Sequence, residues 1–473
     1  IPVQRGTTHI DIYLEAAANP DPAVDRNTWR VSPYTSKAHS PRTPRYVFRS
    51  CDLSVLDRQV AAFASDLDVL WQLVQVLPET GPRRASIIAA LARAIDATDP
   101  DDVPGTVRAA RAELAAVFAS PAHASAHTLV ATGHAHIDSA WLWPVRETIR
   151  KCARTWSNVL ELLDEHPDLT FSASSAQQYQ WMRDHYPQVW KRLKQAVADG
   201  RFFPVGGMWV ESDTNMPGSE AMARQFIAGQ RFFRDELGVR CREVWLPDSF
   251  GYSGALPQIA RSAGARWLLT QKLSWNETNA MPHHSFLWEG IDGSRIFTHF
   301  PPVDSYVSGL APADLAKAER QYSEAGHGTM SLIPFGYGDG GGGPTREMVA
   351  RAERQADLEG SPRLRLGRPD EFFAEAEAEL AHPSTWTGEM YLETHRGTYT
   401  SQVRTKQGNR RSEHALHEAE LWAATAAVRA DAEYPYDEVE RLWQTVLLHQ
   451  FHDILPGSSI AWVHREAEEG YRR

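Results

Sequence analysis

The chain is organised around one stretch, Gly133-His134-Ala135-His136-Ile137-Asp138-Ser139-Ala140-Trp141. Apolar residues at 128–132 precede it and predict a buried strand, and an amphipathic helix pattern begins near Arg146. We therefore expect His136 and Asp138 just past the carboxyl end of a strand, where α/β sheets and barrels hold ligands. Since residues i and i+2 of an extended segment point to the same side, the pair can offer a nitrogen and an oxygen to one divalent cation. The alternative is a pair that only hydrogen-bonds the local backbone.

Strand and helix patterns alternate from this stretch toward the C-terminus. Strands are predicted at residues 128–132, 169–173, 202–205, 243–246, 267–270, 296–300 and 331–335. Helices are predicted from residue 146, at 176–198, and up to Gly238 from an N-terminal cap at Ser219. This alternation predicts an α/β fold with a mostly parallel sheet, open or closed into a barrel.

The regions on either side have a different character. Helix patterns at 53–77, 84–97 and 106–120 predict a helical lead-in, which follows a single strand at 9–15 and a connector at 19–49. Two more helices are predicted at 402–431 and 437–450. We therefore divide the chain into an N-terminal strand, connector and lead-in (1–125), an α/β catalytic domain (126–400) and a helical bundle segment (401–473).

Composition restricts the class of protein. The net charge of −11 and the lack of a polybasic run argue against a nucleic-acid partner, and no apolar stretch is long enough for a membrane span. Cysteine occurs at three scattered positions, which predict no disulfide framework and favour a reducing, cytoplasmic location. Because the chain begins at Ile1 without a leader pattern, we expect it to be a fragment of a longer protein.

Three further motifs carry candidate chemical groups. Asp248 follows the strand pattern at 243–246, and Asp339 lies in a glycine-rich loop after the strand at 331–335. His452 and Asp453 lie where a helix pattern breaks before a Pro-Gly pair. Each has a structural alternative: an Asx-turn or helix cap for Asp248, a flexible turn at Asp339 and a hydrogen-bonded core histidine at 452.

Together these motifs provide metal donors and a separate acid. The four donors that a zinc or cobalt ion could share are His136, Asp138, Asp248 and His452. With Asp339 added, two acids near one site suit glycoside hydrolysis, in which one attacks the sugar and the other transfers the proton. The aromatic residues placed beside these acids, where a sugar ring could stack, are Trp141, Phe250 and Tyr252.

These motifs resemble the retaining α-mannosidases of glycoside hydrolase family 38, in particular the cytosolic and vacuolar branch. The resemblance is dense from Thr128 to Ile460 and rests on residues 134–144, 245–253, 338–344 and 450–453, with further likeness at 203–211, 269–276 and 397–400. It implies a seven-stranded parallel sheet or barrel and then the start of a helical bundle. It also implies a mannose-containing oligosaccharide as substrate and one divalent metal ion, zinc or cobalt.

The resemblance also implies residue roles. The implied metal ligands are His136, Asp138, Asp248 and His452. Asp248 is also the implied nucleophile and Asp339 the acid/base, with His395 and Glu211 as the next candidates for that second role. The Golgi and lysosomal members have two adjacent aspartates where this chain has Asp339 and then a glycine. The implied substrate contacts are Trp141, Phe250, Tyr399 and Asp453.

Two other functions remain open at this point. A metal-dependent deacetylase also uses His and Asp ligands, but its metal activates water and no carboxylate attacks carbon. A truncated sugar-binding fragment with little activity is the other alternative, because the β-rich C-terminal domains of the family are expected to be absent. The sequence leaves the linkage preference undecided, and it allows a homo-oligomer.

Overall fold

The structure is a computed structural model that describes residues 6–9, 50, 52 and 54–473. The connector predicted at 19–49 and, apart from its first residue, the strand predicted at 9–15 lie outside these ranges. Within the described part of the chain, no helix combines the length and the apolar character that crossing a bilayer requires.

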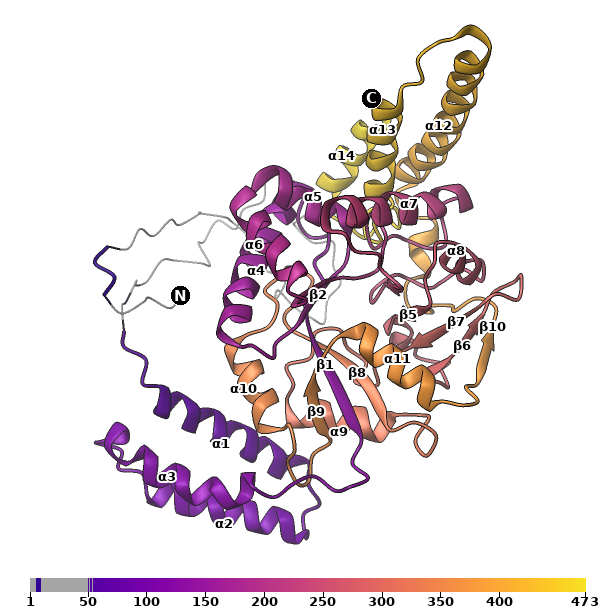
Figure 1. Cartoon of the computed structure of the whole chain (residues 1–473). Coiled ribbons are helices and arrows are strands. Elements are labelled where there is room, and N and C mark those ends of the chain that lie inside the picture. The colour runs from indigo at the N-terminus through magenta and orange to yellow at the C-terminus, as the bar shows by residue number, and fades with distance from the viewer. Residues whose placement is uncertain (1–5, 10–49, 51, 53) are drawn as a thin grey trace.

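The predicted helical lead-in forms three helices, α1 (Arg58–Val76), α2 (Pro82–Asp96) and α3 (Val103–Phe118). Their shared core is made by apolar residues at helical spacing, among them Leu70, Leu91 and Leu114. In Figure 1 this layer lies at one end of the α/β region, beside α9 and α10. Arg354 of α10 attaches to it through an ion pair with the buried Asp66.

The α/β region contains ten strands among the described residues, in two five-stranded sheets. The first sheet consists of β1 (Thr128–His134), β2 (Phe171–Ala173), β3 (Phe202–Pro204), β8 (Met330–Phe335) and β9 (Arg363–Leu366). Its strand order is β3-β2-β1-β8, and β9 also pairs with β1. The second has the order β10-β6-β7-β5-β4 and consists of β4 (Glu243–Trp245), β5 (Trp267–Leu269), β6 (Ser285–Glu289), β7 (Arg295–His299) and β10 (Thr385–Thr387). All pairings are parallel except β6 with β7.

The α/β class and the mostly parallel pairing are confirmed, but the single seven-stranded sheet that the resemblance implies divides into two ladders. Where β8 of the first sheet meets β7 of the second, a side-chain hydrogen bond takes the place of backbone pairing: the Leu332 amide donates to His299 Nε2. At the other junction, the Cys241 thiol before β4 donates to the Pro204 carbonyl of β3. One buried cluster nevertheless takes residues from both sheets, including Val130, Trp245, Leu269, Phe297 and Leu332. The two sheets therefore enclose a common core.

Helices cover the outside of these sheets (Figure 1). They are α4 (Val145–Glu165), α5 (Ala176–His185), α6 (Pro187–Ala198), α7 (Ser219–Leu237), α8 (Leu256–Ser262), α9 (Pro312–Gln321), α10 (Arg346–Arg354) and α11 (Pro369–Glu379). The one helix predicted at 176–198 is two, because Pro187 excludes the helical conformation from the residue before it. Gly238 ends α7 at φ +68° as predicted, but the N-terminal cap is Gly218 and not Ser219.

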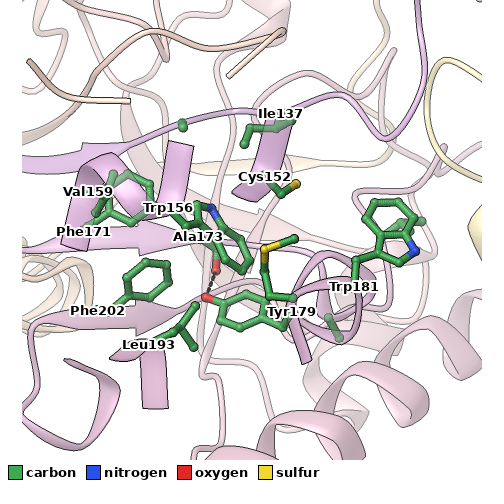
Figure 2. Close-up of a cluster of buried hydrophobic side chains, with 14 of the residues drawn as sticks. Ile137, Cys152, Trp156, Val159, Phe171, Ala173, Tyr179, Trp181, Leu193 and Phe202 are labelled. Carbon is green, nitrogen blue, oxygen red and sulfur yellow. Dashed lines mark hydrogen bonds between the residues drawn. The ribbon is translucent and has the colours of Figure 1, made fainter. Parts of the chain in front are cut away.

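The core beneath β1 to β3 is largely aromatic, and Figure 2 shows Trp156, Tyr179 and Phe202 clustered there. The rings of Trp156 and Tyr179 lie 4.7 Å apart. The Tyr179 hydroxyl donates to the carbonyl of Ala173, the last residue of β2, across 2.9 Å. The core thereby fixes the carboxyl end of β2, at the same edge of the sheet where β1 ends.

The C-terminal segment is helical, as predicted: α12 (Val403–Ala430), α13 (Tyr436–His449) and α14 (Ala461–Arg472). Several contacts attach it to α7, two of which involve neighbouring residues of that helix. Arg224 forms an ion pair with Glu420 of α12, and the Gln225 amide donates to the Leu447 carbonyl of α13. The end of α13 is therefore held against the α/β region, close to the ends of its strands.

Candidate active site

The first two candidate residues come directly after β1. His136 and Asp138 are 1% and 3% exposed, so both have been withdrawn from water. The Asp138 amide donates to the Asp339 carbonyl across 2.9 Å, and the Thr148 hydroxyl donates to the Asp138 carbonyl across 3.0 Å. These bonds fix the backbone of the segment after β1 between α4 and the loop after β8.

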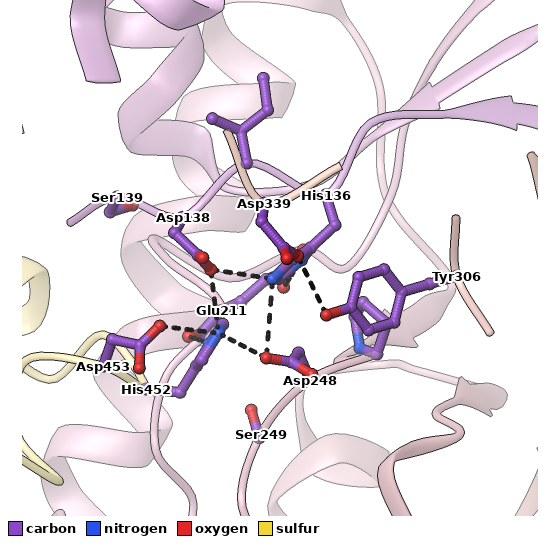
Figure 3. Close-up of polar contacts among 12 residues, drawn as sticks. His136, Asp138, Ser139, Glu211, Asp248, Ser249, Tyr306, Asp339, His452 and Asp453 are labelled. Carbon is purple, nitrogen blue, oxygen red and sulfur yellow. Dashed lines mark hydrogen bonds and ion pairs between the residues drawn. The ribbon is translucent and has the colours of Figure 1, made fainter. Parts of the chain in front are cut away.

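Four residues from three distant segments meet at this point. His136, Asp138, Asp248 and His452 are all buried, and each offers a donor atom within 4.8 Å of the others. Figure 3 shows their side chains converging, with Asp248 from the end of β4 and His452 from the turn after α13. Asp138 Oδ1 lies 2.9 Å from His136 Nε2 and 3.4 Å from His452 Nε2. The structure thus brings together the four sequence-predicted ligands, which we call the metal cluster.

The unsatisfied atoms of the metal cluster fit a bound cation. His136 Nε2, His452 Nε2 and Asp138 Oδ1 are buried and have no hydrogen bond of normal geometry with any described residue. Leaving a buried polar atom unpaired costs about 1–3 kcal/mol, so several such atoms aimed at one point require an explanation. Two imidazoles and two carboxylates form a donor set that suits zinc and other divalent transition metals.

Glu211 orients both imidazoles of the metal cluster. Its carboxylate Oε2 lies 2.9 Å from His136 Nδ1, and its main-chain carbonyl accepts a hydrogen bond of 2.8 Å from His452 Nδ1. Since a carbonyl can only accept, Nδ1 of His452 carries a proton, so the neutral form of this ring presents the lone pair of Nε2 to the cluster. Ser174 donates in turn to the other carboxylate oxygen of Glu211. Partners of this kind set the tautomer of metal-binding histidines.

The electrostatics of the cluster favour additional positive charge. Burial opposes protonation of His136, yet Glu211 and Asp138 raise its pKa well above the ordinary value. Burial likewise opposes protonation of His452, but the close contact with Asp138 and the charges of the nearby carboxylates raise its pKa to about 9. The carboxylates therefore outweigh the cost of burying a cation here. A divalent metal ion would satisfy the same excess of negative charge, and it would compete with these protons.

Lys272 is a site residue that the sequence reasoning did not identify. Its ammonium donates to Asp248 Oδ1 across 2.6 Å, whereas Oδ2 of the same carboxylate faces His452 Nε2 at 3.7 Å. The Lys272 side chain is only 3% exposed, so the ion pair is shielded from water. Its position just past β5 was the available signal, because other candidate residues also follow strand ends. Asp248 therefore lies between His452 of the metal cluster and the buried ammonium of Lys272.

Asp339 lies near the metal cluster, in surroundings that favour the protonated form of its carboxyl group. Burial, together with the charge of Asp138, raises the pKa of Asp339 to about 6. The Tyr306 hydroxyl donates to Asp339 Oδ1 across 3.1 Å, a contact that the sequence reasoning also missed. Asp339 adopts φ +51°, a left-handed conformation that Asp tolerates better than most residues. A buried carboxyl of this kind is suited to donate a proton near neutral pH.

A cavity of about 1330 Å³ is lined by most of the residues that the sequence predicts as catalytic or substrate-binding. Its wall includes the predicted residues Asp138, Trp141, Asp248, Phe250, Asp339, His395 and Asp453. Tyr252 is instead buried, and its hydroxyl donates to the Leu246 carbonyl. Tyr399 is not part of this wall: its hydroxyl accepts a hydrogen bond of 3.4 Å from the Asn215 amide.

The two alternative acid/base candidates have different surroundings. Although burial opposes ionisation of Glu211, the neighbouring His136 lowers its pKa, and both carboxylate oxygens are engaged. Burial lowers the pKa of His395 to about 4, so this imidazole is neutral at ordinary pH. Neither group combines a retained proton with a place on the cavity wall, as Asp339 does.

Two sequence families match this chain. The "Glycosyl hydrolases family 38 N-terminal domain" matches residues 126–391, and the "Alpha mannosidase middle domain" matches residues 393–473. The first match covers more than half of the chain and includes three of the four residues of the metal cluster. The second includes His452.

Curated relatives and solved structures agree with these matches. "Alpha-mannosidase 2C1" of Homo sapiens is 40% identical over 465 residues, which cover 98% of this chain and 44% of the relative. "Alpha-mannosidase" of Saccharomyces cerevisiae is 44% identical over 345 residues, covering 70% of this chain and 32% of the relative. The chain thus spans less than half the length of these relatives. An alpha-mannosidase structure from Enterococcus faecalis V583 shares the fold, with a TM-score of 0.65 at 20% identity over 73% of this chain and 41% of that one.

Proposed function

Because the chain belongs to glycosyl hydrolase family 38, we propose that it is a retaining, metal-dependent α-mannosidase that hydrolyses α-mannosidic bonds of oligosaccharides. The observation that carries this proposal is the placement of Asp248 and Asp339 on one cavity wall beside the metal cluster. Retaining glycosidases need two such carboxyl groups, one as nucleophile and one as acid/base.

The residues that would hold the metal ion are His136, Asp138, Asp248 and His452. When bound, such an ion supplies Lewis-acid stabilisation of charge and orients sugar hydroxyl groups. Glu211 supports this arrangement by keeping a proton on Nδ1 of His452, so that Nε2 faces the cluster. The choice between zinc and cobalt belongs to the same proposal, because the donor set accepts either metal.

Asp248 acts as the nucleophile in this proposal. Its carboxylate forms a bond to the anomeric carbon of mannose while the bond from that carbon to the leaving oxygen breaks. Asp339 gives its proton to the leaving oxygen and then removes a proton from the water that cleaves the mannosyl-aspartate. Lys272 holds one oxygen of Asp248 and keeps the carboxylate in place. Trp141, Phe250 and Asp453 surround the position of the sugar.

Trapping of the covalent intermediate tests this function. A slow fluorinated mannosyl donor should label the metal-loaded protein, and peptide mass spectrometry should place the label on Asp248. The Asp248→Asn variant is the control and should remain unlabelled. A deacetylase or a sugar-binding fragment would not form the adduct, so absence of label on the metal-loaded protein would contradict the proposal.

A cytoplasmic location and self-association stay predictions from the sequence. The first rests on cysteine use, and the two described cysteines, Cys152 and Cys241, are buried free thiols. Size-exclusion chromatography with light scattering would measure the oligomeric state directly.

A further inference from the structure

The cavity beside the metal cluster continues past the residues that would surround one mannose. Its volume of about 1330 Å³ exceeds the roughly 300–1,000 Å³ that is usual for pockets of small ligands. The wall beyond the cluster includes Trp275, Glu277, Thr278 and residues 393–398. This part of the cavity has room for a second ring, and the mechanism described above does not use it.

Trp275 is the prominent aromatic residue of this second part. Its side chain is 48% exposed, whereas most tryptophans of the α/β core are buried. The Lys272 ammonium lies 3.7 Å from the centroid of its ring, and the His395 ring meets it edge-on at 5.8 Å. Lys272 also contacts Asp248, so a single side chain links the indole to the proposed nucleophile. The indole therefore lies next to the reaction centre and contributes apolar surface to a polar cavity.

The segment after Trp275 is held in a fixed conformation. The Asn276 side chain donates to the Tyr391 carbonyl across 3.0 Å and accepts from the Glu393 amide across 2.8 Å. The Glu393 carboxylate accepts hydrogen bonds of 2.8 Å and 2.6 Å from the amide and hydroxyl of Thr278, and one of 2.7 Å from the Asn279 side chain. These bonds join the two segments that form the second part of the wall. A rigid surface of this kind loses little conformational entropy when a ligand binds.

The chemistry of this wall suits a neutral sugar ring. A sugar offers a face of C–H groups, which stacks on an indole, and a rim of hydroxyl groups, which polar side chains can bind. Arg396 and Thr278 line the same wall, and their side chains offer polar groups for that rim. The scissile bond joins the bound mannose to the next sugar of the chain, so that sugar must lie in the cavity beside the reaction centre.

We propose that Trp275 forms the floor of a second sugar-binding subsite, which holds the sugar attached to the mannose that is released. This inference rests on the proposed α-mannosidase function and adds to it that the substrate is recognised as at least a disaccharide. Trp275 thereby discriminates between oligosaccharides and simple mannosides, without a part in the bond-breaking step itself.

A comparison of substrates with and without the second sugar tests the subsite. For the metal-loaded Trp275→Ala variant, kcat/KM on α-linked mannobioses should fall by about tenfold, because the stacked ring loses its platform. On α-mannosyl fluoride, whose leaving group is a single atom, kcat/KM should stay within about twofold of the unmodified protein. Trp275→Phe keeps an aromatic ring and should restore most of the mannobiose activity. Trp422→Ala, which alters an exposed tryptophan of α12 outside the cavity, is the matched control.

Each other outcome has a definite meaning. An equal loss on both substrates would overturn the proposal, since Trp275 would then act through Lys272 and Asp248. No loss on either substrate would also overturn it. Calorimetry with the Asp339→Asn protein separates binding from turnover: mannobiose should bind more tightly than mannose, and Trp275→Ala should remove that difference. If the unmodified protein hydrolyses neither substrate while this binding difference remains, the proposed function fails and the subsite stands.

Discussion

The Nδ1 atom of His136 lies 2.9 Å from the Oε2 atom of Glu211, while Nε2 of the same imidazole faces Asp138. Both side chains are buried, so this contact fixes the ring with one nitrogen toward a carboxylate and the other toward the metal cluster. Glu211 was a sequence candidate for proton transfer. Its surroundings favour a positioning residue, one that would act on a bound metal ion through the two imidazoles.

The Glu211→Gln substitution should weaken metal binding. It removes the charge beside His136 but preserves the main-chain carbonyl that accepts from His452. We expect the dissociation constant for zinc to rise by about 10–100-fold, as is typical for loss of such a partner. Competition with a chromophoric chelator measures this constant. Glu243→Gln is the matched control, because Glu243 is buried but lies outside the metal cluster, and it should leave zinc binding unchanged.

Replacement of the ligands themselves should have a larger effect. His136→Ala and His452→Ala each delete one of the four donors, and most of the bound metal should be lost from both. Elemental analysis of the purified proteins gives the metal content per chain. Unchanged content in both variants would show that the metal, if present, is held elsewhere.

Metal removal should loosen the contact between the helical segment and the α/β region. His452 is the one residue of the metal cluster that lies beyond α13, so the bound ion would join these two parts of the chain. A ligand that binds only the joined arrangement stabilises it. Amide hydrogen exchange at residues 440–455 should therefore be faster after chelation. The lead-in helices α1 to α3 serve as an internal control, and identical exchange at 440–455 in both states would contradict the coupling.

The sequence predicts those site residues whose positions follow from local structure, and it does not predict those placed by contacts between segments far apart in the chain. His136, Asp138 and Asp248 could be predicted because each follows an apolar strand, and parallel strands end at the same edge of a sheet. The position of His452 could not be derived from local pattern alone. It depends on α13 packing against α7 through bonds such as that from Gln225 to the Leu447 carbonyl. The helix break made His452 a candidate donor, and the family resemblance then supported its grouping with the other three.

The residues that sequence reasoning missed act through tertiary contacts. Tyr306 lies in none of the quoted motifs, and Lys272 lies in the stretch 269–276, to which no chemical role was assigned. Their contacts with Asp248 and Asp339 are what mark them as site residues. Tyr399 was implied as a substrate contact by the family resemblance. Its hydroxyl accepts from the Asn215 side chain, which also donates to the carbonyl of the wall residue Phe250, and its role stays a prediction. In the fold, β1 was predicted within two residues, whereas β6, β9 and β10 were not predicted. Short strands such as β10, with three residues, give little periodic signal.

The buried Glu243 should make stability fall as pH rises. Burial raises the pKa of Glu243 to about 7, against an ordinary value of 4.5. Between these two values the folded state binds more protons than the unfolded state, so the free energy of unfolding decreases with increasing pH. Glu243→Gln removes this titration. Its stability relative to the unmodified protein should rise by on the order of 1–3 kcal/mol between pH 4.5 and pH 7.5.

Urea unfolding at several pH values measures this difference. Glu433→Gln is the matched control, because Glu433 is exposed and lies in the loop between α12 and α13. The comparison between variant and unmodified protein cancels the contribution of the metal cluster, which both proteins share. A difference that does not change with pH would show that Glu243 does not retain its proton in the folded protein.

The division of labour between Asp248 and Asp339 has a kinetic consequence. Asp339→Ala should slow hydrolysis of ordinary mannosides severely, because their leaving oxygen needs a proton. It should slow substrates with very good leaving groups far less, because these depart without protonation. Azide should restore the second step for such substrates, since an anion can attack the mannosyl-aspartate without a general base. Rates with and without azide, and mass analysis of the mannosyl azide formed, measure both effects.

Asp248→Ala should abolish turnover of both kinds of substrate, because no leaving group replaces the missing nucleophile. Azide should not rescue this variant with retention, since the covalent intermediate cannot form. Tyr306→Phe is an informative companion to Asp339→Ala: it removes the hydrogen bond to Asp339 and should affect poor leaving groups more than good ones. If Asp339→Ala instead slows both substrate classes equally and azide has no effect, Asp339 is not the acid/base. The role would then move to one of the next candidates, His395 on the cavity wall or Glu211 beside His136.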